Sequence, residues 1–204
     1  MSNGTKVKKR DGRVEPLELD KIHVMVDEAC KGLAGVSASQ VEIKSGIQFY
    51  DGITTGEIQE ILIKSANDLI DLDHPNYQFV AARLLLFAVR KSLYGRKNDL
   101  PDLNNHIQNC TGIQVYDFGI YDKYSLEEIQ KVDSYIDHER DFLFTYAGLR
   151  QVVDKYLVQD RSTGKVYETP QFMYMMIALT IFAEYPKEKR LNYCLLYTSD
   201  AADE

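Results

Sequence analysis

The sequence has no tryptophan and only three cysteines among its 204 residues. Cysteines so few and so widely spaced form neither a disulfide framework nor a four-cysteine zinc site, and they are typical of a reducing cytoplasm. No apolar run reaches the roughly 18 residues that a membrane span needs. No apolar segment follows the basic residues near the N-terminus, so no secretory signal is predicted there. We therefore predict a cytoplasmic protein without membrane contact.

Positive charge is also scarce, because 24 Lys and Arg face 31 Asp and Glu, for a net charge of −7. Proteins that bind nucleic acid usually present a basic face, since neutralising phosphates supplies most of their affinity. The overall balance therefore predicts no nucleic-acid partner. It does not exclude a small anion, which needs only a local cluster of positive charge.

The first 95 residues predict a hairpin followed by four helices. Asp11-Gly12 separates two short strand-like runs, and this pair is typical of a type I′ turn, in which both residues take positive φ. Asp20 stands where its side chain would cap the first helix. The hairpin and the apolar stripes of the helices together indicate a small bundle capped by strands.

The next three helices have recognisable starts. The spacing of a capping box is found at the second and third starts, in the pairs Ser37 with Gln40 and Thr54 with Glu57. The fourth helix is expected to open at Asp73-His74-Pro75, since proline is tolerated in a first turn, and to end at Gly95.

A polar stretch, residues 96–104, contains Pro101 and predicts a connection between domains. Beyond it, the patterns predict helices near residues 103–110, 125–134 and 144–151, a hairpin within residues 156–167, and an apolar helix over residues 170–184. The fold class predicted for the whole chain is α+β, mainly α.

Several runs carry a family resemblance. They are Lys9-Arg10-Asp11-Gly12, residues 15–22, residues 48–53, residues 77–84, residues 136–138 and residues 156–161. The first two runs resemble the start of an ATP-cone domain. In their joint order, from Val7 to Tyr193, the runs resemble the N-terminal part of the large subunit of bacterial or phage class I (aerobic) ribonucleotide reductases. Each run is weak alone, whereas their order and spacing are specific.

The resemblance implies an organisation and a task. It implies an allosteric ATP-cone, a helical bundle with a small β-sheet cap, over residues 5–95, a linker over 96–104, and the helical N-terminal part of the catalytic domain over 105–193. In this family ATP keeps the enzyme active and dATP turns it off, and the whole enzyme reduces ribonucleoside diphosphates by a cysteine-radical mechanism. Implied partners are the radical-generating small (beta) subunit and further copies of the large subunit.

The resemblance also implies the residues that bind ATP or dATP. Lys9, Arg10 and Lys91 would hold the phosphates by charge-assisted hydrogen bonds, although a solvated basic edge is the alternative for these residues. Leu17 and Ile22 would supply an apolar slot for adenine, although they could instead be only core residues. Glu15 would accept a hydrogen bond from the amino group of adenine. Lys21 and Thr55 fall on nucleotide-contact positions of the family, although Thr55 is equally placed to cap a helix. Gln59 stands where the family often has histidine, so it cannot become cationic.

No other motif indicates catalysis or metal binding. The four histidines have no metal-ligand spacing with cysteines or acids, so we expect no metal bound directly by the chain, only Mg²⁺ carried with the nucleotide. The sequence also lacks a P-loop. None of the three cysteines stands in the family's radical or redox contexts, so we expect no catalytic residue and no reductase activity in the chain itself.

The last eleven residues, Cys194 to Glu204, depart from the family pattern. They resemble the translation of a transposon-type sequencing adapter. We therefore expect a truncated reading frame with a non-native tail at residues 194–204, in which a helix would have no biological meaning.

Three other functions compete with this interpretation. The first is a stand-alone ATP-cone that regulates another partner, and the resemblance that continues beyond residue 100 argues against it. A cone-containing transcriptional repressor would carry a four-cysteine zinc ribbon, which the sequence lacks. An anaerobic glycyl-radical reductase shares the cone, but the match beyond residue 130 favours the aerobic class.

Overall fold

The computed structural model describes residues 5–95 and 98–200. The chain forms two compact units. The first contains residues up to Ala88 together with Phe144–Arg150, and the second contains Val89–Leu143 and the residues from Gln151 onward. The division therefore falls inside a helix, seven residues before the boundary expected at residue 95. In the described ranges, no helix is long and apolar enough to cross a membrane.

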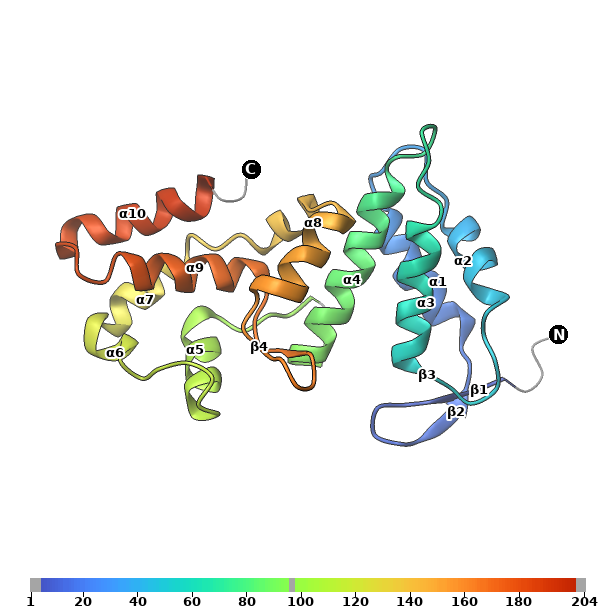
Figure 1. Cartoon of the computed structure of the whole chain (residues 1–204), viewed down its shortest axis with the longest axis horizontal. Helices are drawn as coiled ribbons and strands as arrows, with labels where there is room; N and C mark the ends of the chain where they lie inside the picture. The colour runs from blue at the N-terminus through green and yellow to red at the C-terminus, as the bar shows by residue number, and fades with distance from the viewer. Residues whose placement is uncertain (1–4, 96–97, 201–204) are drawn as a thin grey trace. The chain divides into compact units, whose positions relative to one another are not determined.

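A three-stranded sheet closes one end of the helices in the first unit (Figure 1). Strand β1 (Lys6–Lys8) pairs antiparallel with β2 (Val14–Pro16), which confirms the predicted hairpin. It also pairs in parallel with β3 (Ile53–Thr54), a strand that the sequence did not predict. This parallel pair brings a segment more than 40 residues along the chain beside the hairpin.

The prediction of a type I′ turn in the hairpin was wrong. Only Gly12 of the Asp11-Gly12 pair has positive φ, at 86°. Gly12 N donates to Lys9 O at 3.0 Å, and Lys9 N donates to Arg13 O at 2.8 Å. The loop therefore has three residues, a tight turn followed by a left-handed glycine, which is the next most common hairpin geometry. It positions the end of β1 directly opposite the start of β2.

Four helices complete most of the first unit: α1 (Leu19–Cys30), α2 (Ala38–Gly46), α3 (Thr55–Asn67) and the first turns of α4 (Tyr77–Tyr94). Their apolar stripes face inward, because residues at spacings of three and four share one side of a helix. The buried side chains include Val26, Val41, Leu62, Val80 and Leu84, together with Val7 and Ile53 from the sheet.

The predicted helix ends were right in some places and wrong in others. Thr54 and Glu57 form the predicted capping box, and Gly95 ends α4 with φ 74°. Ser37 precedes α2 but makes no side-chain cap hydrogen bond. The Tyr77 hydroxyl takes the place of the box partners, since it accepts from Ser37 N at 3.0 Å and donates to Gln40 Oε1 at 2.9 Å. Asp20 does not cap α1, whose N-cap residue is Glu18. Helix α4 begins at Tyr77, two residues after the predicted Asp73-His74-Pro75 start.

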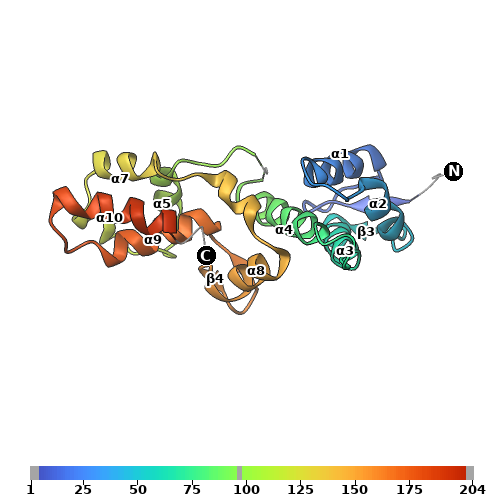
Figure 2. The same ribbon diagram turned by 90° about the horizontal axis from the view of Figure 1, so that it is seen from above.

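The second unit is mostly helical, as predicted. Its elements are α5 (Leu103–Gly112), α6 (Ile120–Lys123), α7 (Leu126–Asp133), the 3-10 helix η1 (His138–Leu143), the π-helix η2 (Val152–Tyr156), the hairpin of β4 (Gln159–Asp160) and β5 (Lys165–Val166), α9 (Pro170–Ile181) and α10 (Lys187–Asp200). Helix α8 (Tyr146–Gln151) lies almost wholly in the segment assigned to the first unit. Helices α9 and α10 run side by side in both views (Figures 1 and 2).

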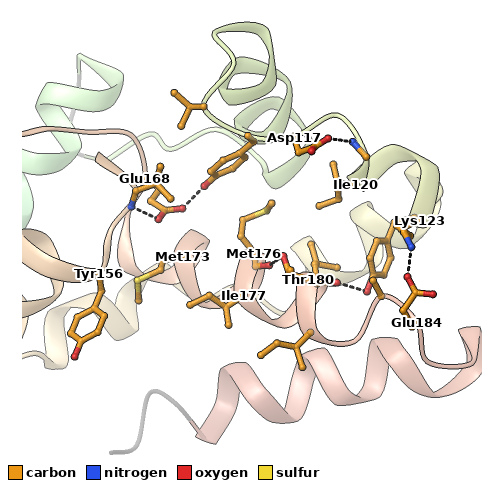
Figure 3. Close-up of a pocket in the computed structure, with 18 residues that line it drawn as sticks. Asp117, Ile120, Lys123, Tyr156, Glu168, Met173, Met176, Ile177, Thr180 and Glu184 are labelled. Atoms are coloured by element: carbon orange, nitrogen blue, oxygen red, sulfur yellow. Dashed lines mark hydrogen bonds and ion pairs between the residues drawn. The ribbon is translucent and has the colours of Figure 1, made fainter. Parts of the chain in front are cut away.

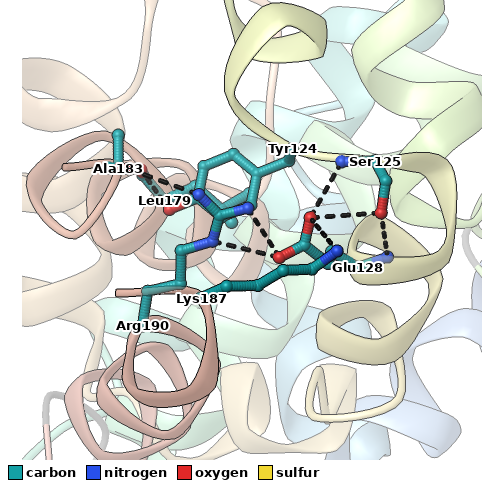
Figure 4. A network of polar contacts seen from close by, with 7 residues as sticks. All are labelled: Tyr124, Ser125, Glu128, Leu179, Ala183, Lys187 and Arg190. Carbon is teal, nitrogen blue, oxygen red and sulfur yellow. Dashed lines mark hydrogen bonds and ion pairs between the residues drawn. The ribbon is translucent and has the colours of Figure 1, made fainter. Parts of the chain in front are cut away.

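A charged network attaches α10 to α7 (Figure 4). The buried Glu128 carboxylate accepts from Arg190 Nη2 at 2.6 Å and from Ser125 N at 3.0 Å. The Arg190 guanidinium also lies over the Tyr124 ring, 4.3 Å from its centroid, a cation–π geometry. Helix α10 continues into the residues expected to be non-native, where Cys194 packs into the unit's hydrophobic core. The foreign origin of residues 194–204 stays a prediction.

The core of the second unit includes buried histidines. His106 stacks on Phe172 with ring centroids 4.2 Å apart, and its Nε2 lies 3.1 Å from the Tyr116 hydroxyl. His138 packs edge-on against the same Phe172 ring, with ring centroids 4.9 Å apart. Burial lowers the pKa of each histidine to about 4, with a further lowering of His138 by Arg90. Both side chains are therefore neutral in the folded protein near neutral pH.

We expect the second unit to lose stability as the pH falls from about 6.5 to about 4, on the order of 3 kcal/mol for each histidine. The sign follows from the lowered pKa, because the unfolded histidines take up protons in this range while the folded ones do not. The buried Asp141 carboxyl, whose pKa is raised to about 6, offsets part of this loss because it takes up a proton in the folded state. Urea unfolding at a series of pH values measures the loss. His106→Gln, which does not titrate, should show a shallower dependence, and a flat profile in the parent would contradict the prediction.

Candidate nucleotide-binding site

The hairpin concentrates positive charge in an otherwise acidic chain. Residues 6–15 contain five basic and two acidic side chains. Strand β1 leads into Lys9 and Arg10 at the loop, and β2 carries Glu15 back alongside them. A local positive field of this kind attracts small anions even when the net charge of the chain is negative.

Two predicted site residues, Lys9 and Glu15, are in direct contact. Lys9 Nζ lies 3.3 Å from Glu15 Oε2, and both side chains are about 30% exposed, at 28% and 31%. Arg13 Nη1 reaches the other carboxylate oxygen of Glu15 at 3.1 Å. Arg10, in the loop, is exposed. The hairpin alone thus brings together a predicted phosphate contact and the predicted adenine contact.

The start of α1 places the next predicted residues beside the end of β2. Leu17 is held by its backbone, because Leu17 N donates to Thr5 O at 2.9 Å, and its side chain is half-buried. Ile22 is 8% exposed and therefore serves mainly as a core residue. Lys21 is exposed and pairs with Glu18 at 2.9 Å. Of the two apolar residues predicted to form the adenine slot, Leu17 is the more accessible.

The N-terminus of α3 is adjacent to the hairpin through the parallel strand pair. Lys8 lies opposite Thr54 in the register, so Lys9 and Thr55 are the next residues on neighbouring segments. Thr54 is the N-cap, which removes the alternative that Thr55 is only a cap. Within the described residues, the Thr55 hydroxyl makes no hydrogen bond, so it remains available to a ligand.

The dipole of α3 is already matched by a carboxylate. Glu57 Oε2 accepts from Thr54 N at 2.8 Å, and Glu57 Oε1 accepts from the Tyr50 hydroxyl at 2.8 Å. These hydrogen bonds lower the pKa of Glu57 and keep it ionised. A negative side chain at this position interacts favourably with the positive end of the helix dipole. An anion bound nearby would therefore depend on the lysines, rather than on α3, for its attraction.

The last two predicted residues lie on different elements. Gln59, on α3, is half-buried, and its Nε2 donates to Leu84 O at 2.9 Å. This hydrogen bond links α3 to α4 and gives Gln59 a structural role. Lys91 is exposed on α4 beyond Ala88, in the second unit, and its place in the site stays a prediction.

Comparison with known proteins gives these residues a context. Residues 5–92 match the ATP cone domain, and residues 142–201 match the ribonucleotide reductase, all-alpha domain. Ribonucleoside-diphosphate reductase subunit alpha of Haemophilus influenzae and ribonucleoside-diphosphate reductase 1 subunit alpha of Escherichia coli are each 47% identical over 193 residues, which is 95% of this chain and 25% of the relative. The subunit alpha of Enterobacteria phage T4 is 42% identical over 165 residues, 80% of this chain and 22% of the relative.

The chain thus carries an ATP cone and a match to the reductase all-alpha domain, and over 95% of its length it is similar to the N-terminal quarter of ribonucleotide reductase large subunits. This confirms the family resemblance, and the mainly α fold with a small sheet agrees with the fold class predicted from it. The chain spans about a quarter of the length of the Haemophilus influenzae and Escherichia coli subunits that it matches. The all-alpha match reaches residue 201 and so includes residues 194–201, which lie in the stretch predicted to be foreign.

One residue of this reductase cone, Glu18, was missed by sequence reasoning. It immediately precedes α1 and pairs with Lys21. The signal for it was present, because an acidic residue three positions before a lysine at the start of a helix is a standard ion-pair spacing.

In the described part of the chain, no group of three or more His, Cys, Asp or Glu side chains has the arrangement of a metal site.

A separate cavity of about 690 Å³ lies in the second unit (Figure 3). Its wall is mainly apolar and includes Met173, Met176 and Ile177 of α9. The buried Glu168 carboxylate forms part of this wall and accepts from the Tyr116 hydroxyl and from Val158 N. Apolar side chains elsewhere in the unit are also exposed, among them Phe118 at 64% and Tyr156 at 61%.

Proposed function

We propose that residues 5–92 bind ATP and dATP as competing allosteric effectors. The observation that carries the proposal is the position of Lys9, Glu15 and Lys21 around the hairpin and the start of α1, inside a region that matches the ATP cone domain. Triphosphate needs fixed cations, and charge-assisted hydrogen bonds to phosphate are about twice as strong as neutral ones.

The residues take distinct roles in this proposal. Lys9, Arg10 and Lys91 bind the phosphates, with Lys21 near them. Glu15 accepts from the adenine amino group, and Leu17 covers the base with a smaller contribution from Ile22. Thr55 donates to the sugar or a phosphate, and Gln59 supports α3 and α4 beside the site. Mg²⁺ enters with the nucleotide, bound by phosphate oxygens rather than by the chain.

We also propose the activity of the whole protein. It reduces ribonucleoside diphosphates to deoxyribonucleotides in the cytoplasm as a class I enzyme, with a radical-generating small subunit and with self-association of the large subunit. ATP at the cone maintains activity and dATP suppresses it. The catalytic cysteines lie outside residues 1–204. The exposed apolar side chains of the second unit pack against the remainder of the whole protein, so this unit alone should be poorly soluble.

Isothermal titration of the 204-residue chain tests the effector proposal. ATP and dATP should each bind saturably with Mg²⁺ present and should compete with one another, whereas CTP should bind much more weakly because it lacks the adenine edge that Glu15 recognises. Failure of a folded chain to bind either adenine nucleotide would refute the proposal. Equal binding of CTP would refute only the role of Glu15 in base selection.

A stand-alone nucleotide-sensing module is the second candidate. It is favoured by one observation, that the ATP cone match ends at residue 92 and is therefore separable from the later match. Against it stands the reductase all-alpha match over residues 142–201. Purification of the source protein decides between the two, since a reductase copurifies with ribonucleotide-reducing activity.

A further inference from the structure

Within the chain itself, two cations of the proposed site are already paired with carboxylates. Lys9 lies 3.3 Å from Glu15, and Lys21 lies 2.9 Å from Glu18. The hairpin and the first turn of α1 thus partly neutralise two of the cations assigned to the nucleotide, and Arg13 also shares the Glu15 carboxylate. Triphosphate that binds these lysines therefore competes with the carboxylates for their positive charge.

The two ion pairs are electrically coupled. The pKa of Glu18 is lowered first by its hydrogen bond from Lys21, and Lys9 contributes a smaller lowering. The pKa of Lys21 is raised first by Glu18, with a smaller contribution from Glu15. Glu18 therefore acts directly on Lys21 and more weakly on Lys9, the predicted phosphate contact.

The negative charge of Glu18 favours the N-terminus of α1, but its side chain is held mainly by the exposed pair with Lys21. It is the residue before α1, but its side chain makes no cap hydrogen bond. Its side chain is 52% exposed, and that of Lys21 is 66% exposed. Exposed pairs of this kind contribute little to folding, and they exchange readily when a more highly charged partner arrives. A carboxylate also repels phosphate within a Debye length of about 8 Å.

We infer that Glu18 is an intramolecular competitor of the nucleotide: it occupies Lys21, acts on Lys9, and so limits the affinity of the cone for triphosphate. The inference rests on the proposed function, because it concerns the same site. In this arrangement Glu15 changes partner from Lys9 to the base when nucleotide binds, whereas Glu18 gains no new partner. Glu18 therefore lowers affinity without contributing to base recognition, which keeps effector binding weak enough to reverse.

The test compares Glu18→Gln with a matched variant, Asp27→Asn, which removes one negative charge from an exposed position near the other end of α1. Titration uses ATP and, separately, inorganic tripolyphosphate, which has no base or sugar. Glu18→Gln should bind both about two- to fivefold more tightly than the parent, and Asp27→Asn should remain close to the parent. The gain should shrink in high salt, because exposed charges are screened.

A double-mutant cycle locates the effect. If Glu18 acts by occupying Lys21, Glu18→Gln should give a smaller gain in a Lys21→Met background than in the parent. The competitor role is overturned if the parent binds ATP but Glu18→Gln binds no more tightly than Asp27→Asn. If the folded parent binds no ATP at all, the proposed function itself fails. Circular dichroism of each variant confirms that α1 is intact.

Discussion

Lys9→Ala combined with Lys91→Ala should weaken ATP binding by about 100-fold or more, because each change removes a charge-assisted hydrogen bond of about 1.5–3 kcal/mol. The affinity for dATP should fall in parallel, since both lysines are assigned to the phosphates and not to the sugar. Isothermal titration of the 204-residue chain measures both effects.

A matched control separates loss of the site from loss of positive charge. Lys31→Ala combined with Lys64→Ala also removes two exposed lysines, at positions that the proposed site does not use. This control should bind ATP almost as tightly as the parent. Tight binding by the Lys9, Lys91 variant would contradict the phosphate assignment, and the single variants would then show whether only one lysine contributes.

Asp141→Ala should destabilise the second unit by about 3–5 kcal/mol, because it leaves a buried guanidinium without its counter-ion. Arg90 is 3% exposed, and its Nη2 lies 3.0 Å from Asp141 Oδ2 and 2.7 Å from His138 O. Burial raises the pKa of Asp141 to about 6, and Arg90 opposes that rise. Urea unfolding at neutral pH, where the carboxylate is ionised, measures the loss.

Two further variants test the physical reason for this loss. Arg90→Met combined with Asp141→Leu should recover much of the stability, because an apolar pair needs no compensation for lost hydration. Glu184→Ala breaks the exposed pair with Lys123 and should cost far less stability than Asp141→Ala, because exposed ion pairs contribute little. A similar small cost for Asp141→Ala would show that the buried pair does not hold η1 against α4.

The first unit shows which local signals predict structure and which do not. Thr54 with Glu57 and Ser37 with Gln40 have the same capping-box spacing, yet only the first forms the box. The difference comes from tertiary structure. The Tyr77 hydroxyl, 37 residues along the chain from Gln40, donates a hydrogen bond to the Gln40 side chain, which is then not available to the capping box. Strand β3 had no signal of its own, since two residues become a strand only when β1 supplies the hydrogen bonds.

The candidate site was predictable to a similar extent. Family resemblance pointed to Lys9, Glu15 and Lys21, and the fold brings these residues to the hairpin and the adjoining helix start. The resemblance could not show that Gln59 bonds to the Leu84 carbonyl or that Ile22 is mainly a core residue, because both depend on how the helices pack. It also gave no weight to Glu18, whose effect arises from repulsion of a ligand rather than from contact with it.

The most direct test of the account is an amide NMR titration of the isotopically labelled chain with ATP and Mg²⁺. We predict saturable shifts that are largest for residues 7–22 and for Thr55, with small shifts around the second unit's cavity. Shifts concentrated at the cavity residues, such as Met173 and Glu168, with the hairpin unaffected would contradict it, because the nucleotide would then be bound outside the cone.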